Sequence, residues 1–529
     1  MSNINEELIM KRKIVSCGLA ASFLIYAGCY DSVELTKEKL IQTHSQTDIS
    51  VVTKLCRRYE FKTGSYSISG DSLFGVGMQK LAPPFKDVPF QDPIALSDIV
   101  VIETREFNTG KTILLAGGIA LGVAGIVALS NGGNESAPPP PPPSYTGGKF
   151  SCPFLYTFDG SKYHFESETF SGSVFKGLER TAFDVLYHLK PTQGLCKLKL
   201  VNAREETEYV NHLSLIAVDH PVGTAILPDR TGVMRTISAP VHPVQCLSYT
   251  GKDVLTEILS RDSVYWFSTL SGREWTDERN FRDGLIVEFP KPDHATSVKL
   301  IVSGKNTLLG YFALATIFQL KGASKVEWYR QLETDSTERA KFVAWLMRQG
   351  MLHVQLCQNG KWVERGAFID VGPGISKEQI MVLNIRDVTE NMLKVRLECT
   401  TDLWRIDQVY ADYSPDLPVH SVEMIPVSAT SEHGQDVSNL LNASDDRYYV
   451  TVSNQYADIE FSAVPETNGC ERSYVAKTQG FYYQWLNADG PSQDVLVDQI
   501  LSGDQVGTRV LMSQWVHQRA RYEAISELH

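Results

Sequence analysis

The chain has 529 residues, of which 43% are hydrophobic and 21% are charged, a balance ordinary for globular domains that bury a core. Its net charge of −12 argues against nucleic acid as a partner, because that binding depends on cationic contacts to phosphate. From the length alone we expect three or four domains, since a domain averages roughly 150 residues.

The N-terminal segment 1–29 has the features of a secretory signal peptide. Three consecutive positive residues, 11–13, precede an uncharged apolar run at 14–27. This run is shorter than the about 20 apolar residues that a membrane-spanning helix needs. The signal is already complete from Met10, so we expect the chain to start at either Met1 or Met10.

The signal ends in a motif that resembles the lipobox of bacterial lipoproteins. Ala27, Gly28 and Cys29 match the lipobox, and Tyr26 departs from its usual Leu. The resemblance implies that Cys29 receives a diacylglyceryl group and becomes the mature N-terminus. Several palmitate-type chains would hold the protein at a membrane, since each buried CH₂ adds about 0.8 kcal/mol. The alternatives are an ordinary signal peptide or an uncleaved anchor, in which the cysteine is incidental.

The next residues predict a tether and a small β domain. Residues 30–47 are polar and are expected to be the tether. Within 48–110, short runs rich in β-branched and aromatic residues alternate with Gly and Pro, which is the pattern of strands. Four or five such strands predict a small β-barrel-like unit or a strongly bent sheet.

A second apolar segment follows, and we expect a Gly/Ala-rich hydrophobic helix at 111–130. Thr112–Leu129 carries no charge, and Gly118 and Gly122 form a GxxxG motif, which lets another backbone approach a helix closely. One alternative is a transmembrane helix, and the other is a helix lying on the protein or on the bilayer surface. A full span would return the rest of the chain to the cytoplasm if Cys29 lies outside it.

Residues 131–149 are a Pro-rich linker. Its centre is the run Pro138–Pro143, and oligoproline forms an extended helix of about 3.1 Å per residue. We expect it to act as a semi-rigid spacer.

The remainder predicts three consecutive domains: a β domain at 150–292, an α+β domain at 293–414 and a C-terminal β-rich domain at 415–529. Asp159-Gly160 and Asn359-Gly360 each separate two β-type runs, as the turn of a hairpin does.

Helices are expected at 307–320, 325–347 and 503–525 from their apolar spacing. The predicted fold class is therefore mainly β, with β-sandwich-like modules and a few α-helices.

Nine cysteines are present. Cys17 falls in the signal, and the seven beyond Cys29 are scattered without any CxxC spacing. Disulfides are possible outside the cytoplasm. We favour buried free thiols at Cys56, Cys152, Cys196, Cys246, Cys357, Cys399 and Cys470.

The large region also resembles a group of large, β-rich lipoproteins of Gram-negative bacteria. The motifs that carry this resemblance are Ser151-Cys-Pro-Phe with Phe158-Asp-Gly, Ser171-Gly with Lys176-Gly-Leu-Glu-Arg180, Val218-Asp-His-Pro221, Trp404-Arg-Ile-Asp407 and Gly480-Phe-Tyr-Tyr483. The resemblance implies a membrane-anchored cell-envelope protein, on the periplasmic or the outer-membrane face. It implies no reaction.

Few side chains suggest chemistry. His164, Glu166 and Glu168 alternate along an expected strand, so they project from one face and could ligate a metal, although a solvated strand face explains them as well. Asp219-His220 could be half of a catalytic pair, but no Gly-x-Ser-x-Gly elbow accompanies it.

Two other polar groups have no supporting pattern. Ser171-Gly-Ser173 lacks the flanking residues of a nucleophile motif, and Asp445-Asp446 lacks EF-hand spacing. Since no Walker loop, HExxH or dinucleotide motif is present either, we assign no catalytic, cofactor or metal residue. The lipidation site Cys29 is the only site residue assigned.

Two functional classes remain. The first is a membrane-anchored envelope lipoprotein that binds or scaffolds protein or glycan partners, with exposed aromatic patches on its sheets. The second is an envelope hydrolase of polysaccharide or peptidoglycan, which needs a cleft with two carboxylates roughly 5–10 Å apart. We favour the first. The aromatic side chains considered for partner binding are Trp266, Trp275, Trp362, Trp404 and Trp485.

Overall fold

The chain is described here by a computed structural model, in which two compact units are separated: Met1–Ser144 and Tyr145–His529. The signal segment, Cys29, the apolar run 112–129 and the Pro-rich linker lie outside the described residues. The structure describes residues 30–34, 40, 47–53, 57–80, 86–107, 153–267, 281–486, 488 and 490–526.

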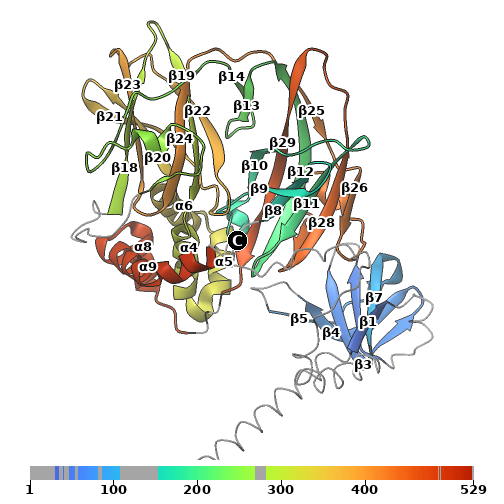
Figure 1. Ribbon diagram of the computed structural model, residues 1–529. Helices are drawn as coiled ribbons and strands as arrows, with labels where there is room; N and C mark the ends of the chain where they lie inside the picture. Colours follow the sequence, from blue (N-terminus) through green and yellow to red (C-terminus); the bar gives the residue numbers. More distant parts are fainter. Residues whose placement is uncertain are drawn as a thin grey trace, which may run out of the picture. The chain divides into compact units, whose positions relative to one another are not determined.

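The first unit is a mixed-length antiparallel sheet with the strand order β1-β7-β2-β3-β4-β5, in which β6 also pairs with β4 (Figure 1). Its strands are β1 (Tyr30–Glu34), β2 (Ile49–Thr53), β3 (Arg58–Ser69), β4 (Ser72–Lys80), β5 (Val88–Phe90), β6 (Ile94–Ala95) and β7 (Ile99–Phe107), with a 3₁₀ turn at Leu96–Asp98. The sheet buries Val51, Phe61, Leu73 and Ile102 on one side.

The structure corrects two sequence-based expectations for this unit. Part of the expected tether, Tyr30–Glu34, is strand β1, because its backbone pairs with β7 from Tyr30↔Phe107 to Glu34↔Glu103. The sheet is also not a closed barrel: among the described strands, β1 pairs only with β7 and β5 only with β4, so both edges stay open.

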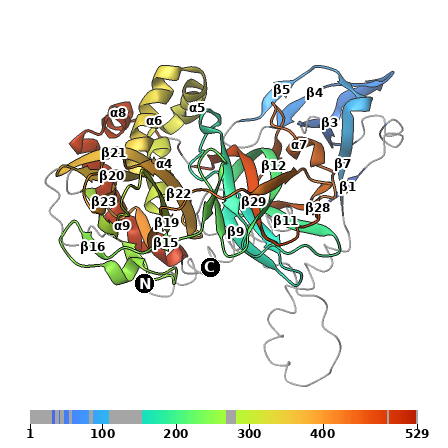
Figure 2. The same ribbon diagram turned by 90° about the horizontal axis from the view of Figure 1, so that it is seen from above.

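The second unit contains two β-sandwiches, which Figures 1 and 2 show side by side. The sheets of the first sandwich have the orders β26-β28-β11-β8-β9 and β10-β29-β12-β25, with β27 added to β12. Its strands are β8 (Phe154–Phe158), β9 (Tyr163–Glu168), β10 (Arg180–Val185), β11 (Leu195–Asn202), β12 (Glu206–Pro221), β25 (His420–Met424), β26 (Ser428–Ser431), β27 (Tyr449–Thr451), β28 (Gln455–Ser462) and β29 (Cys470–Gln484).

The second sandwich has the sheet orders β15-β24-β19-β22 and β16-β18-β23-β20-β21, with β17 added to β24, and a small β13-β14 hairpin lies beside it. These strands are β13 (Ala225–Pro228), β14 (Met234–Ile237), β15 (Pro240–Val241), β16 (Gln245–Ser248), β17 (Trp266–Phe267), β18 (Arg282–Pro290), β19 (Ser297–Asn306), β20 (Leu352–Gln358), β21 (Lys361–Phe368), β22 (Lys377–Asn384), β23 (Met392–Thr400) and β24 (Trp404–Asp412). Strand β23 shows the expected period of two: Leu393, Val395 and Leu397 are buried between half-buried polar neighbours.

Most of the helices gather at one end of the second sandwich (Figure 1). They are α4 (Leu309–Leu320), α5 (Lys325–Thr334), α6 (Ser336–Gly350), α8 (Asp494–Ser502) and α9 (Gln505–Ser526), whereas the short α7 (Ser438–Leu441) contacts β12, and 3₁₀ turns occur at Lys176–Leu178, Leu255–Ile258 and Gly322–Ser324. The single helix expected at 325–347 is two helices, because the Asp335 carboxylate accepts hydrogen bonds from the N–H groups of Thr337 and Glu338 and so starts α6 anew.

The fold class is confirmed as mainly β with a few helices, and both hairpins are present as β8–β9 and β20–β21. The arrangement along the chain is different from three domains in a row. Strand β12 of the expected 150–292 domain pairs along its length with β29 of the expected 415–529 domain. The first sandwich is therefore built from both ends of the unit, and the second sandwich is inserted between them.

Candidate functional site: an apolar pocket beside Asp370

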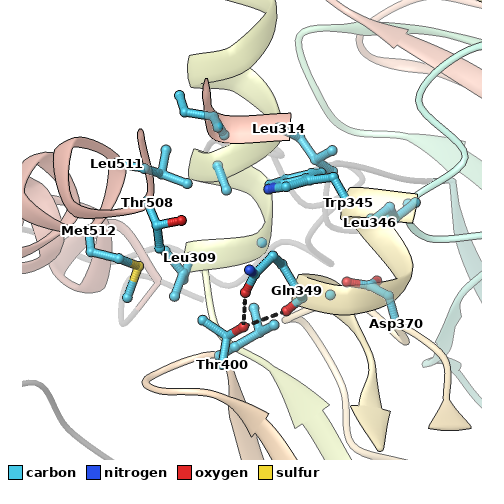
Figure 3. A pocket seen from close by; sticks show the side chains of 16 residues that line it. Leu309, Leu314, Trp345, Leu346, Gln349, Asp370, Thr400, Thr508, Leu511 and Met512 are labelled. Carbon is cyan, nitrogen blue, oxygen red and sulfur yellow. Dashed lines mark hydrogen bonds between the residues drawn. The ribbon is translucent and has the colours of Figure 1, made fainter. Parts of the chain in front are cut away.

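A pocket lies among helices α4, α6, α8 and α9, where they meet the end of the second sandwich (Figure 3). It offers about 50 Å³ of space to water, which is room for roughly four water molecules or a small organic group. Most of its lining is apolar. The lining residues are Gly172, Leu309, Gly310, Ala313, Leu314, Trp345, Leu346, Gln349, Gly350, Asp370, Thr400, Leu403, Ile500, Thr508, Leu511 and Met512.

Asp370 is the only ionisable residue of this lining. Ser171 Oγ and the Gly372 N–H both donate hydrogen bonds to its Oδ1, the second at 3.1 Å. Its Oδ2 faces the first turn of α4, since a Cβ added to Gly310 would lie 3.6 Å from it. Burial raises the pKa of Asp370, while the hydrogen bond from Ser171 and the charge of Arg180 oppose the rise.

Gln349 supplies the amide of the pocket. Thr400 Oγ1 donates to Gln349 Oε1 at 2.9 Å and to the Gln349 carbonyl at 2.8 Å, which fixes the side chain (Figure 3). The Nε2 group is buried and donates to no described residue.

Arg348 of helix α6 links that helix to α8 beside the pocket. Its Nη2 donates to the Leu501 carbonyl at 3.2 Å, at the C-terminal end of α8, where a cation is favoured by the helix dipole. Gly503 follows with a positive φ of 78°, as a helix C-terminus requires. Further along, the Trp515 indole donates to Asp402 Oδ2 at 2.6 Å and joins α9 to the sandwich.

A second carboxyl group, Glu168, lies at the junction of the two sandwiches and is fully buried. Its carboxylate lies against Gly372 and Gly374, at each of which a Cβ would overlap it. Burial raises the pKa of Glu168 to about 8, although the charges of Arg204 and Lys377 act to lower it. Burial therefore favours the protonated form of Glu168 in this fold.

The expected His164, Glu166 and Glu168 group does not assemble. A bulge in the β8–β9 pairing breaks the alternation, with Leu155 opposite Ser167 and Tyr156 opposite Phe165. Among the described residues, no group of three or more His, Cys, Asp or Glu side chains could hold a metal ion.

Two of these side chains have partners of their own instead. His164 Nε2 bonds Asp159 Oδ2 at 2.6 Å, and Glu166 Oε1 bonds His188 Nδ1 at 2.9 Å. The His164 and His188 rings are stacked at 4.3 Å between centroids. Both histidines therefore have partners within the protein.

Asp219 and His220 do not form a catalytic pair. Being neighbours on strand β12, they point to opposite faces. Asp219 binds the Arg472 guanidinium through both oxygens, at 2.6 and 2.8 Å, and this hydrogen bonding holds the pKa of Asp219 well below its usual range. His220 bonds the hydroxyls of Thr224 and Ser473.

Other sequence candidates have structural roles. Ser171 supports Asp370, while Ser173 is buried with no bond from its Oγ to the described residues. Asp445 pairs with Arg447 at 2.7 Å in a loop. Trp266 and Trp404 are core residues, Trp362 and Trp485 are half-buried, and Trp275 lies outside the described residues.

The expectation of free, buried cysteine thiols is confirmed for the described cysteines. These are free and buried or half-buried: Cys196, Cys246, Cys357, Cys399 and Cys470. Cys56 and Cys152 lie outside the described residues.

The sequence reasoning missed Asp370 and Gln349. The only local signal is Asp370-Val-Gly-Pro-Gly374, an acidic residue before a Gly-rich loop. Its meaning depends on Ser171, 199 positions away, and on the four helices of the pocket.

The structure thus defines a mainly β protein with two units and an apolar pocket at the helical end of the second. No protein-family model and no curated protein matches this chain. One solved structure with a match is the crystal structure of the GH31 alpha-xylosidase from Xanthomonas citri, at 10% identity and a TM-score of 0.17. The match covers 79% of this chain and spans 38% of that enzyme's chain, and the score does not establish a shared fold.

Proposed function

We propose that this protein is a membrane-anchored lipoprotein of the cell envelope whose second unit binds a ligand or partner. The observation that carries the binding role is the pocket beside Asp370: it lies among helices where they meet the second sandwich, is mostly apolar, and has a few polar groups in its lining. Ligand sites commonly have this composition, because apolar lining supplies affinity and a few polar groups orient the ligand.

The anchoring part of the proposal rests on the sequence and on one strand pairing. Cys29 directly precedes Tyr30, and the apolar run 112–129 begins five residues after Phe107. Tyr30 and Phe107 are paired in the β1–β7 ladder. Acyl chains on Cys29 and the apolar run would therefore reach a membrane from the same end of the first unit. Among the described residues, no helix is both long and apolar enough to cross a bilayer.

The alternative, a hydrolase of polysaccharide or peptidoglycan, gains no support from the described carboxylates. Hydrolysis of a glycoside uses two carboxyl groups roughly 5–10 Å apart around the substrate. Asp370 is the only carboxyl group among the residues that line the pocket. Glu206 and Glu208 lie two positions apart on β12, but both are buried, and burial with the neighbouring carboxyl raises the pKa of Glu208.

The proposal is tested in two independent arms. For anchoring, a bacterial host producing the wild-type chain or Cys29→Ser is fed radiolabelled palmitate. We expect label and membrane association for the wild type and no label for the variant; an unlabelled wild-type chain in the soluble fraction would reject the anchor.

For binding, crosslinking in intact cells is followed by purification and mass spectrometry of both proteins and small molecules. Ala313→Leu fills the pocket and is the matched variant, because Ala313 is buried in its wall. We expect a species that is recovered with the wild type and lost with Ala313→Leu. Identical recoveries would reject the pocket as the binding site.

A further inference from the structure

Strand β4 of the first unit carries its large apolar side chains on the solvent side of the sheet. Phe74, Val76 and Met78 alternate along the strand and are 42%, 59% and 38% exposed. Alternate residues of a strand point to the same face, so these three side chains form one apolar row, the β4 row. Single exposed hydrophobic residues are ordinary, whereas a contiguous exposed set commonly marks an interaction surface.

The core of the first unit does not account for the β4 row. The positions between its members face the core and are Gly75 and Gly77. A Cβ added to either glycine would lie within 3 Å of the Phe61 ring, at 2.9 and 2.7 Å, and Phe61 is itself buried. Phe61 therefore fills the core beneath β4, and the bulk of β4 is left on the opposite face.

The strand register places the β4 row at the end of the sheet where the anchors are expected. One line of paired residues crosses the sheet from β7 to β4: Thr104, Ile49, Phe61 and Gly77. Phe107 and Phe74 each lie three residues beyond this line, toward the same end, because successive strands are antiparallel. Tyr30 pairs with Phe107 and so lies at that end as well.

The end of the β3–β4 hairpin is nearly without charge. Residues 65–78 include a single charged residue, Asp71, in the turn. The charged side chains further along the hairpin are paired within the unit, Lys62 with Asp48 at 2.7 Å and Lys80 with Glu60 at 3.7 Å. The β4 row therefore offers apolar area rather than charge to whatever covers it.

We propose that the β4 row docks on the surface of a lipid bilayer. This inference rests on the proposed anchoring and adds that the first unit itself lies against the membrane. Cys29 directly precedes Tyr30, and the apolar run 112–129 begins five residues after Phe107, a reach of at most about 18 Å. Both anchors thus hold the bilayer close to the end that carries Phe74. Apolar side chains that enter the boundary between head groups and acyl chains leave water without needing a complementary protein surface.

Site-specific photocrosslinking tests this docking. The photoreactive residue p-benzoylphenylalanine replaces Val76 in the full chain, which is produced in a bacterial host, and the intact cells are irradiated. Mass spectrometry then identifies what is attached at position 76: a lipid, another protein, or the 112–129 segment of the same chain. We expect lipid.

Val88 is the matched control position. It is also an exposed valine of the first unit, at 42%, but it pairs with Gln79 and therefore lies on the opposite face from Met78, further from the Phe74 end. We expect lipid adducts at position 76 to exceed those at position 88 by about fivefold or more, since only a docked side chain reaches the acyl boundary.

A second variant separates docking from mere proximity to the membrane. Phe74→Ser is combined with the photoreactive residue at position 76. If Phe74 helps to hold the row in the bilayer, lipid adducts should fall by about fivefold, since burial of one large apolar side chain is lost. Because Phe74 is exposed, the thermal unfolding midpoint is expected to stay unchanged.

Failure of this inference and failure of the anchor give different results. In membrane-associated protein, three outcomes would overturn the docking and leave the anchor standing: equal lipid adducts at positions 76 and 88, adducts of position 76 with a protein or with 112–129 in place of lipid, or unchanged adducts in Phe74→Ser. A wild-type chain recovered in the soluble fraction would reject the anchor, and the docking with it.

Discussion

Ser171 and Asp370 are 199 positions apart in the sequence, and Ser171 Oγ donates a hydrogen bond to Asp370 Oδ1. Ser171 follows strand β9 of the first sandwich, and Asp370 follows strand β21 of the second. One hydrogen bond therefore joins the two sandwiches at the edge of the pocket. The neighbouring Glu168, whose carboxyl group packs against the backbone of Gly372 and Gly374, lies at the same junction.

The first prediction concerns the pH dependence of stability through Glu168. Its pKa rises from 4.5 to about 8 on folding, so between these values the folded chain keeps a proton that the unfolded chain has lost. Glu168 therefore lowers the free energy of unfolding as pH rises from about 4.5 to 8, by up to a few kcal/mol. We expect Glu168→Gln to remove this part of the pH dependence of the free energy of unfolding, as measured by urea denaturation at pH 5 and pH 8. Parallel pH profiles for the two proteins would contradict the assignment.

The second prediction concerns the close contact between Gly372 and the Glu168 carboxyl group. Gly372 has φ of +85°, and a Cβ there would overlap the Glu168 carboxylate, so we expect Gly372→Ala to cost about 3 kcal/mol or more in free energy of unfolding. Gly469→Ala is the matched control. Gly469 has a similar φ of +79° with nothing within 4 Å of the added Cβ, and only backbone strain of about 1–2 kcal/mol is expected. Equal costs in urea denaturation would show that contact with Glu168 is unimportant.

The third prediction concerns Asp219, which is a structural residue in this fold. Asp219→Ala leaves the buried Arg472 guanidinium without its carboxylate, and we expect a loss of about 3–5 kcal/mol in free energy of unfolding. Asp445→Ala breaks a comparable but exposed pair with Arg447 and is expected to cost much less, because solvent screens that pair. Thermal and urea denaturation of both variants measures the difference. A small loss for Asp219→Ala would reopen the question of another role.

The fourth prediction concerns the order of the chain in the second unit. A chain that ends at residue 414 lacks β28 and β29, which pair with β11 and β12 in the centre of the first sandwich. We expect this truncated chain to be unfolded or aggregated, while 145–529 folds as one unit. Circular dichroism and limited proteolysis of both chains provide the measurement. A folded, protease-resistant product ending at 414 would instead support consecutive domains.

Much of the local structure follows from the sequence because its causes are local. Asn359-Gly360 has the positive φ angles of a two-residue turn, 49° and 74°. Asp159-Gly160 begins a four-residue loop, in which the Asp159 carboxylate accepts from the N–H groups of Ser161 and Lys162. Both hairpins form where the sequence predicts them. The alternation of Leu393, Val395 and Leu397 predicts a half-buried strand wherever that strand is placed. A cap such as Asp335 is also local, yet the apolar spacing on both sides of it concealed the break between α5 and α6.

The pairing of distant strands and the pocket have no such local cause. Strand β12 could be completed by any extended segment of suitable pattern, and only the packing of the whole second unit selects β29. Likewise, a buried carboxyl group such as Glu168 cannot be told from a solvated one by its neighbours in sequence, since its pKa depends on what covers it. The sequence by itself determined the β-rich character and the position of the hairpins, and it predicts the anchor at Cys29. Only the tertiary structure decided which strands meet and how Asp370 comes to line an apolar pocket, because both depend on contacts between residues far apart in the chain.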